Sequence, residues 1–363
     1  MKVKLIIVAG FLGSGKTTLL WDIARRLTGQ GKAVGLITND QAPDLVDTAF
    51  LSASGASVKE VTGSCFCCNF GGLINAVDSL IGQKVDVIIA EPVGSCTDLS
   101  ATIMQPLKDK YPEIDLAPFT VLADPERVLE ALDKKSSLMH ASARYILRKQ
   151  MEEADIILLN KIDTLSPDNR GLITSLLAET FPGSDVGEIS ALNGDGIDDW
   201  LASVLLSDKA GKQIVDVDYD RYAEGEAVLG WLNAVVSLES IGGNTGWGRY
   251  SRDMLERLAR EFRQHNAEVG HVKLVIESDG KRCMANLTQL RGGIVFRGDE
   301  PFMGFQANLI LNARVQMSPE KLEEIVRAAF SASIQNHISS TIRSLSSIMP
   351  GRPDPTYRYS HTV

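Results

Sequence analysis

The sequence predicts an α/β protein that begins with a doubly wound, mostly parallel sheet and ends in a smaller α+β domain. In residues 1–206, short apolar runs alternate with amphipathic segments, which is the pattern of parallel βαβ units. After residue 226 the order changes, because strands follow one another with few helices between them. Several early runs are near-continuous in Val, Ile and Leu, as expected where helices cover both faces of a sheet.

The first part of the chain is expected to hold strands and helices in alternation. The expected strands are residues 4–9, 33–38, 57–61, 85–90, 118–123, 156–160 and 185–189. The expected helices are residues 16–29, 72–80, 125–132, 143–154, 167–181 and 197–206. Ligands of such a sheet bind beyond the carboxyl ends of its strands, so the residues that follow the strands are the first candidates for function.

Composition sets the expected domain limits. Residues 1–206 form the first domain, and the polar, acidic residues 207–226 are expected to be a linker. Residues 227–349 form the small α+β domain, with a ferredoxin-like order of elements. Its expected strands are 227–238, 271–277, 283–289 and 308–315, and its expected helices are 252–265 and 319–333. The tail, residues 350–363, has three prolines and little apolar content, so we expect it to be loosely ordered.

Charge and cysteine content exclude several classes of function. The net charge is −9 and the pI is about 5.2, with no basic cluster of the kind that binds a phosphate backbone, so we expect no nucleic-acid partner. No apolar stretch reaches the ~20 residues that span a bilayer, so we expect no membrane partner. Three of the five cysteines fall within residues 65–68, which is a poor disulfide framework and indicates a reducing, cytoplasmic setting.

Residues 10–17 read GFLGSGKT and match the phosphate-loop pattern G-x-x-x-x-G-K-[ST] at every position. The motif lies between an expected strand and an expected helix, where backbone N–H groups and the helix dipole can surround a phosphate. A chance glycine-rich turn is the alternative, and the strict match disfavours it. A dinucleotide-binding turn is disfavoured as well, since Thr18 occupies the place of its third glycine.

Each residue of this loop has an expected role. Lys16 reaches the β- and γ-phosphates, Thr17 binds Mg²⁺, and Thr18 helps to hold the α-phosphate. Gly13, Ser14 and Gly15 supply the backbone around the phosphates.

A Mg²⁺-nucleotide site also needs an acidic partner that faces the loop. Glu91 ends an expected strand and is positioned to hold a Mg²⁺-bound water or to orient the attacking one. Asp40 ends another strand and is a candidate for the same Mg²⁺ shell. A surface acid that caps a strand or helix is the alternative for both residues, and it is the stronger alternative for Asp40.

Residues 160–163 read NKID after an apolar strand and match N-K-x-D. In this pattern the Asp163 carboxylate accepts from both N1–H and N2–H₂ of guanine, a donor pair that adenine lacks. Lys161 lies along the base, and Asn160 braces the neighbouring loop. Residues 190–192 (Ser190, Ala191 and Leu192) follow the next strand, where a backbone N–H meets guanine O6. The sequence therefore favours GTP over ATP.

Cys65, Cys67 and Cys68 follow the strand 57–61 and are expected on the same edge of the sheet. Thiolates at this spacing share one soft or borderline cation such as Zn²⁺, and three ligands leave one position open for transfer. Buried free cysteines and a redox pair are the alternatives. Cys96 is a further candidate ligand, although a small buried residue is the favoured interpretation, and Cys283 is expected in a core.

Together, the phosphate loop, the C-x-C-C motif, Glu91 and N-K-x-D resemble the CobW/HypB/UreG family of metal-handling P-loop GTPases, in its CobW-like branch. The resemblance implies a GTP hydrolase in which Lys16 and Glu91 serve catalysis and the three cysteines carry a cargo metal. It also implies delivery of Zn²⁺ or Co²⁺ to a client metalloprotein or a cobalamin-related enzyme, with a nucleotide-dependent homodimer as a further expectation. The sequence departs from the branch at residues 40–47, at 91–96 and in a linker without histidines.

The working hypothesis is that Mg²⁺ and GTP order the segment between Asp40 and Cys68 and so fix the thiolates in metal-binding geometry. Two rivals remain open. One is a P-loop kinase or an ATP-dependent ligase, which residues 160–163 disfavour. The other is a GTP-gated accessory or adaptor protein for a corrinoid-dependent or other metalloenzyme, without its own metal cargo.

Overall fold

The computed structural model describes residues 2–40, 46–132, 139–288, 293–298 and 303–363. These residues divide into two compact units. Met1–Gln41, Leu51–Gly225 and Arg352–Val363 form the first unit, and Ala42–Phe50 and Glu226–Gly351 form the second. The chain therefore changes unit four times, at residues 41/42, 50/51, 225/226 and 351/352.

The first unit is built on a parallel sheet of order β3-β2-β4-β1-β6-β7-β8, with the short β5 paired to β1. The strands are β1 (Val3–Gly10), β2 (Val34–Asn39), β3 (Ser57–Val61), β4 (Val87–Glu91), β5 (Ile114–Leu116), β6 (Thr120–Ala123), β7 (Ile156–Leu159) and β8 (Asp185–Glu188). The chain leaves β1 toward β3, returns to β4 and then continues on the other side of β1. The predicted parallel α/β sheet is thus confirmed, and only β5 was not expected.

Helices alternate with these strands because their apolar faces pack on the sheet. They are α1 (Lys16–Gly29), α3 (Phe70–Gly82), α4 (Gln105–Lys110), α5 (Pro125–Leu132), α6 (Ala141–Glu152), α7 (Pro167–Thr180), α8 (Ile197–Leu206) and α9 (Tyr219–Ala227). Leu20 and Ile23 of α1 share one buried cluster with Ile6 of β1 and Trp200 of α8. Such burial contributes on the order of 1.5–3 kcal/mol for each large apolar side chain.

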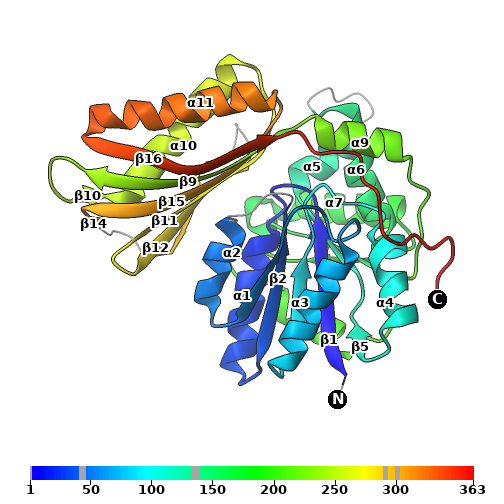
Figure 1. Cartoon of the computed structure of the whole chain (residues 1–363). Helices are drawn as coiled ribbons and strands as arrows, with labels where there is room; N and C mark the ends of the chain where they lie inside the picture. Colours follow the sequence, from blue (N-terminus) through cyan, green and yellow to red (C-terminus); the bar gives the residue numbers. More distant parts are fainter. Residues whose placement is uncertain (1, 41–45, 133–138, 289–292, 299–302) are drawn as a thin grey trace. The chain divides into compact units, whose positions relative to one another are not determined.

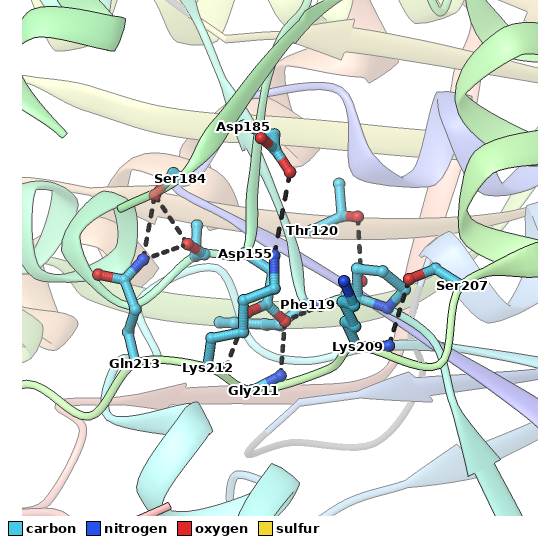
Figure 2. A network of polar contacts seen from close by, with 12 residues as sticks. Phe119, Thr120, Asp155, Ser184, Asp185, Ser207, Lys209, Gly211, Lys212 and Gln213 are labelled. Carbon is cyan, nitrogen blue, oxygen red and sulfur yellow. Dashed lines mark hydrogen bonds and ion pairs between the residues drawn. The ribbon is translucent and has the colours of Figure 1, made fainter. Parts of the chain in front are cut away.

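The segment expected as a linker does not run free between the domains. Figure 2 shows that it lies against the first unit, around the buried carboxylate of Asp155. One oxygen of Asp155 accepts hydrogen bonds from the backbone N–H groups of Phe119 (2.7 Å) and Gly211 (2.6 Å), and the other accepts from that of Lys212 (2.8 Å). Because a buried carboxylate needs donors, the polar residues near 211 complete the fold of the first unit.

The tail also differs from the expectation of loose order. It forms no helix or strand, yet Arg358 donates to the buried Asp98 (2.6 Å) and the backbone N–H of Val363 donates to Gln105 (2.8 Å). The ring of Tyr357 meets that of Phe70 edge-on, with centroids 5.2 Å apart. Side-chain anchors therefore hold this segment where its composition gave no signal.

The second unit is an antiparallel sheet of order β13-β12-β11-β15-β9-β16. Its strands are β9 (Gly230–Ser240), β11 (Val269–Ser278), β12 (Lys281–Leu287), β13 (Val295–Gly298), β15 (Gln306–Val315) and β16 (Ile338–Ile348), with a separate short pair β10 (Thr245–Gly246) and β14 (Met303–Gly304). The strands β11-β15-β9-β16, with helices α10 (Trp247–Gln264) and α11 (Pro319–Ser331), have the ferredoxin-like order. Figure 1 shows both helices on one side of this sheet. The Ser-rich β16 was not expected.

A short helix from the N-terminal half of the chain belongs to the second unit. It is α2 (Val46–Leu51), between β2 and β3 in sequence. The backbone N–H of Val46 donates to Asn312 Oδ1 (2.8 Å), and Lys273 Nζ lies 2.7 and 2.8 Å from the carboxylate oxygens of Asp47. Among the described residues, no helix has the length and apolarity needed to cross a membrane.

Candidate nucleotide and metal site

All candidate site residues lie at or after the carboxyl ends of strands in the first unit, which is the edge of the sheet meant below. Because the strands are parallel, their carboxyl ends share that edge. The phosphate loop follows β1, Asp40 follows β2, the three cysteines follow β3, Glu91 ends β4, and residues 160–163 follow β7. The structure thus brings the predicted phosphate, metal and base residues to one side of the first unit.

The phosphate loop has the backbone that its glycines predict. Gly10, Gly13 and Gly15 have φ values of 136°, 79° and 100°, which side chains disfavour. A Cβ on Gly15 would lie 2.3 Å from Asn160 Nδ2. The buried Lys16 donates to the carbonyl of Gly10 (2.8 Å) and to that of Phe11 (3.3 Å), so its ammonium lies inside the loop.

Two further features fit a phosphate and a divalent cation. Ser14 Oγ is buried and has no hydrogen-bond partner within the described residues, which suits a phosphate oxygen. Thr17 Oγ1 donates to Glu91 Oε1 (3.3 Å), so a hydroxyl and a carboxylate meet beside Lys16, as a Mg²⁺ shell requires. Thr18 is half-buried in the first turn of α1, next to these groups in the chain.

The predicted second acid, Asp40, lies just past β2. Its backbone N–H donates to the carbonyl of Val61 (3.2 Å), and its side chain is half-buried. Residue Thr38 of β2 is the register partner of Glu91, so Asp40 lies at the same end of the sheet as Glu91. Residues 41–45 of the expected switch segment lie outside the described part of the chain.

The N-K-x-D motif is tied to the phosphate loop by its first residue. Asn160 Nδ2 donates to the carbonyl of Ser14 (2.7 Å), and its Oδ1 accepts from the backbone N–H of Ala191 (2.9 Å). Asn160 thus links the phosphate loop to the loop that follows β8. The backbone N–H of Ala191 is thereby engaged by Asn160, and that of Ser190 donates to the carbonyl of Asp195 (3.0 Å), so two of the three N–H groups expected near guanine O6 already have partners within the chain.

The other residues of the motif are oriented by partners that the sequence did not indicate. Lys161, which has a positive φ of 59°, pairs with Asp124, a buried residue that follows β6. The exposed Asp163 accepts a hydrogen bond from Ser190 Oγ (2.5 Å) through one oxygen. Its carboxylate is thereby held in one orientation while it stays exposed to solvent.

Asn39, the last residue of β2, shapes the loop that carries the cysteines. Its Nδ2 donates to the carbonyls of Val61 and Ser64 (2.9 Å each), and its Oδ1 accepts from the backbone N–H of Phe66 (2.8 Å). The amide N–H of Cys68 donates to the carbonyl of Cys65 (3.0 Å), which closes the turn that leads into α3. Sequence reasoning missed Asn39, since no motif marks a buried amide that pairs with a distant loop.

Cys65, Cys67 and Cys68, hereafter the cysteine cluster, have their sulfur atoms within 4.8 Å of one another. The Sγ–Sγ distances are 2.8 Å for Cys65–Cys67, 3.3 Å for Cys65–Cys68 and 3.8 Å for Cys67–Cys68. Cys65 and Cys67 are buried and Cys68 is half-buried. Three thiols at this separation form a ligand set for a soft or borderline divalent cation.

Hydrogen bonds within the cluster lower the pKa of one thiol and raise the pKa of the other two. The bonds from Cys67 and Cys68 hold the pKa of Cys65 well below its usual range. The hydrogen bond to Cys65 raises the pKa of Cys67, and the same contact raises the pKa of Cys68 to about 11. Cys65 is therefore the thiol of the cluster that loses its proton most readily, and a metal that binds all three sulfur atoms displaces their protons.

The C-terminal tail of the first unit covers the outer side of the cysteine cluster. The backbone N–H of Asp354 donates to Cys68 Sγ (3.2 Å), and that of Thr356 donates to the carbonyl of Cys67 (2.8 Å). A backbone N–H directed at sulfur favours the thiolate form. Because these residues are about 286 positions from Cys68 in the chain, sequence spacing gave no indication of the contact.

A phosphate loop between β1 and α1 of a parallel sheet, with an acid at a neighbouring strand end, defines a P-loop nucleotide-binding protein. Residues 4–180 match the model of the CobW/HypB/UreG nucleotide-binding domain, and this part of the chain belongs to that family. The resemblance predicted from the motifs is therefore confirmed.

Curated relatives of the chain include two zinc chaperones. YeiR of Escherichia coli (strain K12) is 33% identical over 166 residues, which cover 45% of this chain and 48% of YeiR. CobW of Pseudomonas aeruginosa is 26% identical over 212 residues, which cover 50% of this chain and 55% of CobW. The chain thus spans about half the length of the curated relatives it matches. Among solved structures, Helicobacter pylori HypB in complex with nickel matches with 18% identity and a TM-score of 0.42, over 56% of this chain and 86% of HypB.

Proposed function

We propose that this protein is a Mg²⁺-dependent GTP hydrolase that binds a transition metal through its cysteine cluster and delivers it to a client. The observation that carries the proposal is the position of both sites at one edge of one parallel sheet. The phosphate loop and the cysteine loop follow β1 and β3, and β4 and β2 lie between these strands. Only the ends of β4 and β2 therefore separate the phosphate loop from the cysteine loop, so a movement at one site has a short path to the other.

The residues around the phosphate loop support hydrolysis of a nucleoside triphosphate. Lys16 exchanges its two backbone carbonyl partners for phosphate oxygens, and Thr17 with Glu91 holds Mg²⁺ or a water bound to it. Mg²⁺ supplies neutralisation of the charge that develops on the phosphates. Within this set, Lys16 and Glu91 act on the reacting group, and Glu91 orients the attacking water.

Guanine is the base that the N-K-x-D geometry favours. Asp163 is held by Ser190 with its carboxylate exposed, ready to accept the two donors of the guanine edge. Adenine would leave this carboxylate opposite an acceptor, which costs on the order of a few kcal/mol for a desolvated polar group. This argues for GTP and against a kinase or ligase that uses ATP.

The cysteine cluster supplies the cargo site. Three thiolates suit Zn²⁺ or Co²⁺, and the zinc chaperones among the relatives favour zinc. In this proposal the protein works in the cytoplasm, forms a homodimer in one nucleotide state, and gives its metal to a client metalloprotein or a cobalamin-related enzyme. Helix α2 follows Asp40 closely in the chain and packs within the second unit, against Asn312 and Lys273. This connection supports a response of the second unit to the nucleotide state.

The proposal is tested by metal titration at fixed nucleotide state. We expect Zn²⁺ or Co²⁺ to bind at least about tenfold more tightly with Mg²⁺ and a non-hydrolysable GTP analogue than with GDP, because the nucleotide orders the edge that carries the thiolates. An ATP analogue should produce no such gain.

Replacement of Cys65, Cys67 and Cys68 by Ser is the matched variant, and Cys283→Ser, a buried cysteine of β12, is its control. Only the triple variant should lose the metal. Equal affinities in both nucleotide states would remove the coupling, and unchanged metal content in the triple variant would favour the adaptor without cargo.

A further inference from the structure

A fourth thiol lies against the cysteine cluster. Cys96 is fully buried, and its side chain is within hydrogen-bonding distance of those of Cys65 and Cys67. It comes from the loop after β4, whereas the cluster comes from the loop after β3. The loops of two strands at the same end of the sheet therefore place a fourth sulfur atom beside Cys65 and Cys67, although only the three sulfur atoms of the cluster all lie within 4.8 Å of one another.

The separations of the three sulfur atoms within the cluster are close to those of a four-coordinate metal site. Zinc binds thiolates at about 2.3 Å, so four thiolates in a tetrahedron are about 3.8 Å apart. Cys67 and Cys68 already have this separation, at 3.8 Å. Cys65 is 2.8 and 3.3 Å from them, so an outward shift of Cys65 by up to about 1 Å makes room for an ion.

We propose that Cys96 supplies the fourth thiolate to the metal bound by the cysteine cluster. This inference rests on the proposed function, since it takes the cluster to be the cargo site. The cluster then has no open position while Cys96 is bound, and it gains one when Cys96 withdraws. Release of the cargo becomes a change from four thiolates to three.

The loop that carries Cys96 also contacts the phosphate loop. It begins at Glu91, which accepts from Thr17, and a Cβ on Gly94 would lie 3.1 Å from Lys16 Nζ. Gln150 of α6 holds the loop from the other side, because its Nε2 donates to the carbonyls of Gly94 (3.0 Å) and Cys96 (2.7 Å). When Lys16 binds phosphate and Glu91 binds Mg²⁺, a shift of either side chain moves the loop after β4. A short, buried stretch of backbone then carries this shift to Cys96.

The alternative is that Cys96 only fills space in the core, as small buried cysteines often do. The two interpretations differ in the number of sulfur atoms around the metal. X-ray absorption spectroscopy of the wild-type protein with Zn²⁺, Mg²⁺ and a GTP analogue counts these atoms without any substitution. Four sulfur scatterers support the proposal, and three with one oxygen or nitrogen overturn it. A sample with no bound zinc would instead contradict the proposed function itself.

Substitution gives the second, independent measurement. In the Co²⁺-loaded protein the thiolate-to-metal charge-transfer absorption should fall by about a quarter in Cys96→Ala, with a loss of affinity of at least about tenfold. Cys283→Ala, equally buried in β12, is the matched control and should leave both unchanged. If Cys96→Ala binds Co²⁺ with the wild-type spectrum and affinity, Cys96 is not a ligand, while binding itself would still support the proposed function.

Discussion

The phosphate loop and the cysteine cluster lie at the same end of the sheet but are built in different ways. The phosphate loop is made by consecutive residues between β1 and α1, and three positive-φ glycines fix its shape. The cysteine cluster, in contrast, lies where three distant segments meet, namely residues 63–69, residues 93–98 and the tail. The phosphate loop depends on local backbone geometry, whereas the cysteine cluster depends on contacts between segments that are far apart in the chain.

The largest expected effect comes from a single change in the locally built site. Gly15→Ala places a Cβ at φ 100°, 2.3 Å from Asn160 Nδ2, which combines strain of about 1–2 kcal/mol with displacement of the N-K-x-D residue. We expect GTP affinity to fall on the order of 100-fold or more, measured by calorimetry. Gly171→Ala is the control, since a Cβ in this part of α7 meets nothing within 4 Å and should stabilise the fold slightly. Wild-type affinity in Gly15→Ala would show that the loop tolerates side chains.

A smaller effect is expected where the tail is anchored over the cysteine cluster. Arg358→Ala removes the ion-pair partner of Asp98, which is 1% exposed and keeps a hydrogen bond from Tyr219. We expect unfolding free energy to fall by about 1–3 kcal/mol, because a buried carboxylate loses its charge partner and the partly exposed Arg358 limits the loss. Chemical denaturation measures this.

The tail offers its own control for that experiment. Arg352→Ala breaks an exposed pair with Asp220, whose side chain is 86% exposed, and should change stability by no more than about 0.5 kcal/mol. Similar losses in both variants would mean that Asp98 does not anchor the tail. Faster proteolysis of the tail in Arg358→Ala alone would sharpen the contrast with the locally built loop.

The last effect is a gradual one, a pH dependence that arises at the buried acid Glu153. Glu153 is buried and accepts hydrogen bonds from Thr97 Oγ1 (3.0 Å) and from the backbone N–H of Ser100 (2.8 Å). Thr97 directly follows Cys96 in the chain. Burial raises its pKa from 4.5 to about 8. Between these values the folded protein holds a proton that the unfolded chain has lost, so stability is fully present below pH 4.5 and falls as the pH rises through 8.

Glu153→Gln removes that titration, because the amide resembles the protonated acid. Wild-type stability should decline by at most about 1.4 kcal/mol per pH unit from this group, and the variant should lack this part of the slope in denaturation between pH 6 and 9. Glu152→Gln is the control, since the pKa of Glu152 is lowered and its carboxylate stays charged over this range. Equal slopes for wild type and Glu153→Gln would contradict the assignment.

The same contrast explains what the sequence could predict. The strands of the first unit and the residues of the phosphate loop follow from periodicity and from a motif whose spacing is fixed by the backbone, so these predictions agree with the structure. Asn39, Asp124 and the tail act through contacts with residues far along the chain, and no local pattern records such contacts. The linker and tail were judged by composition alone, although single buried acids, Asp155 and Asp98, hold both segments to the first unit.

The placement of α2 and the tail has a practical consequence for dividing the protein. A fragment that stops at Gly225 keeps the phosphate loop, but Asp47 loses Lys273 and Cys68 loses the backbone donor of Asp354. Conversely, residues 226–351 alone lack helix α2, which contacts Lys273 and Asn312. The two units are interleaved along the gene even though each has its own core, so neither half of the coding sequence encodes a complete unit.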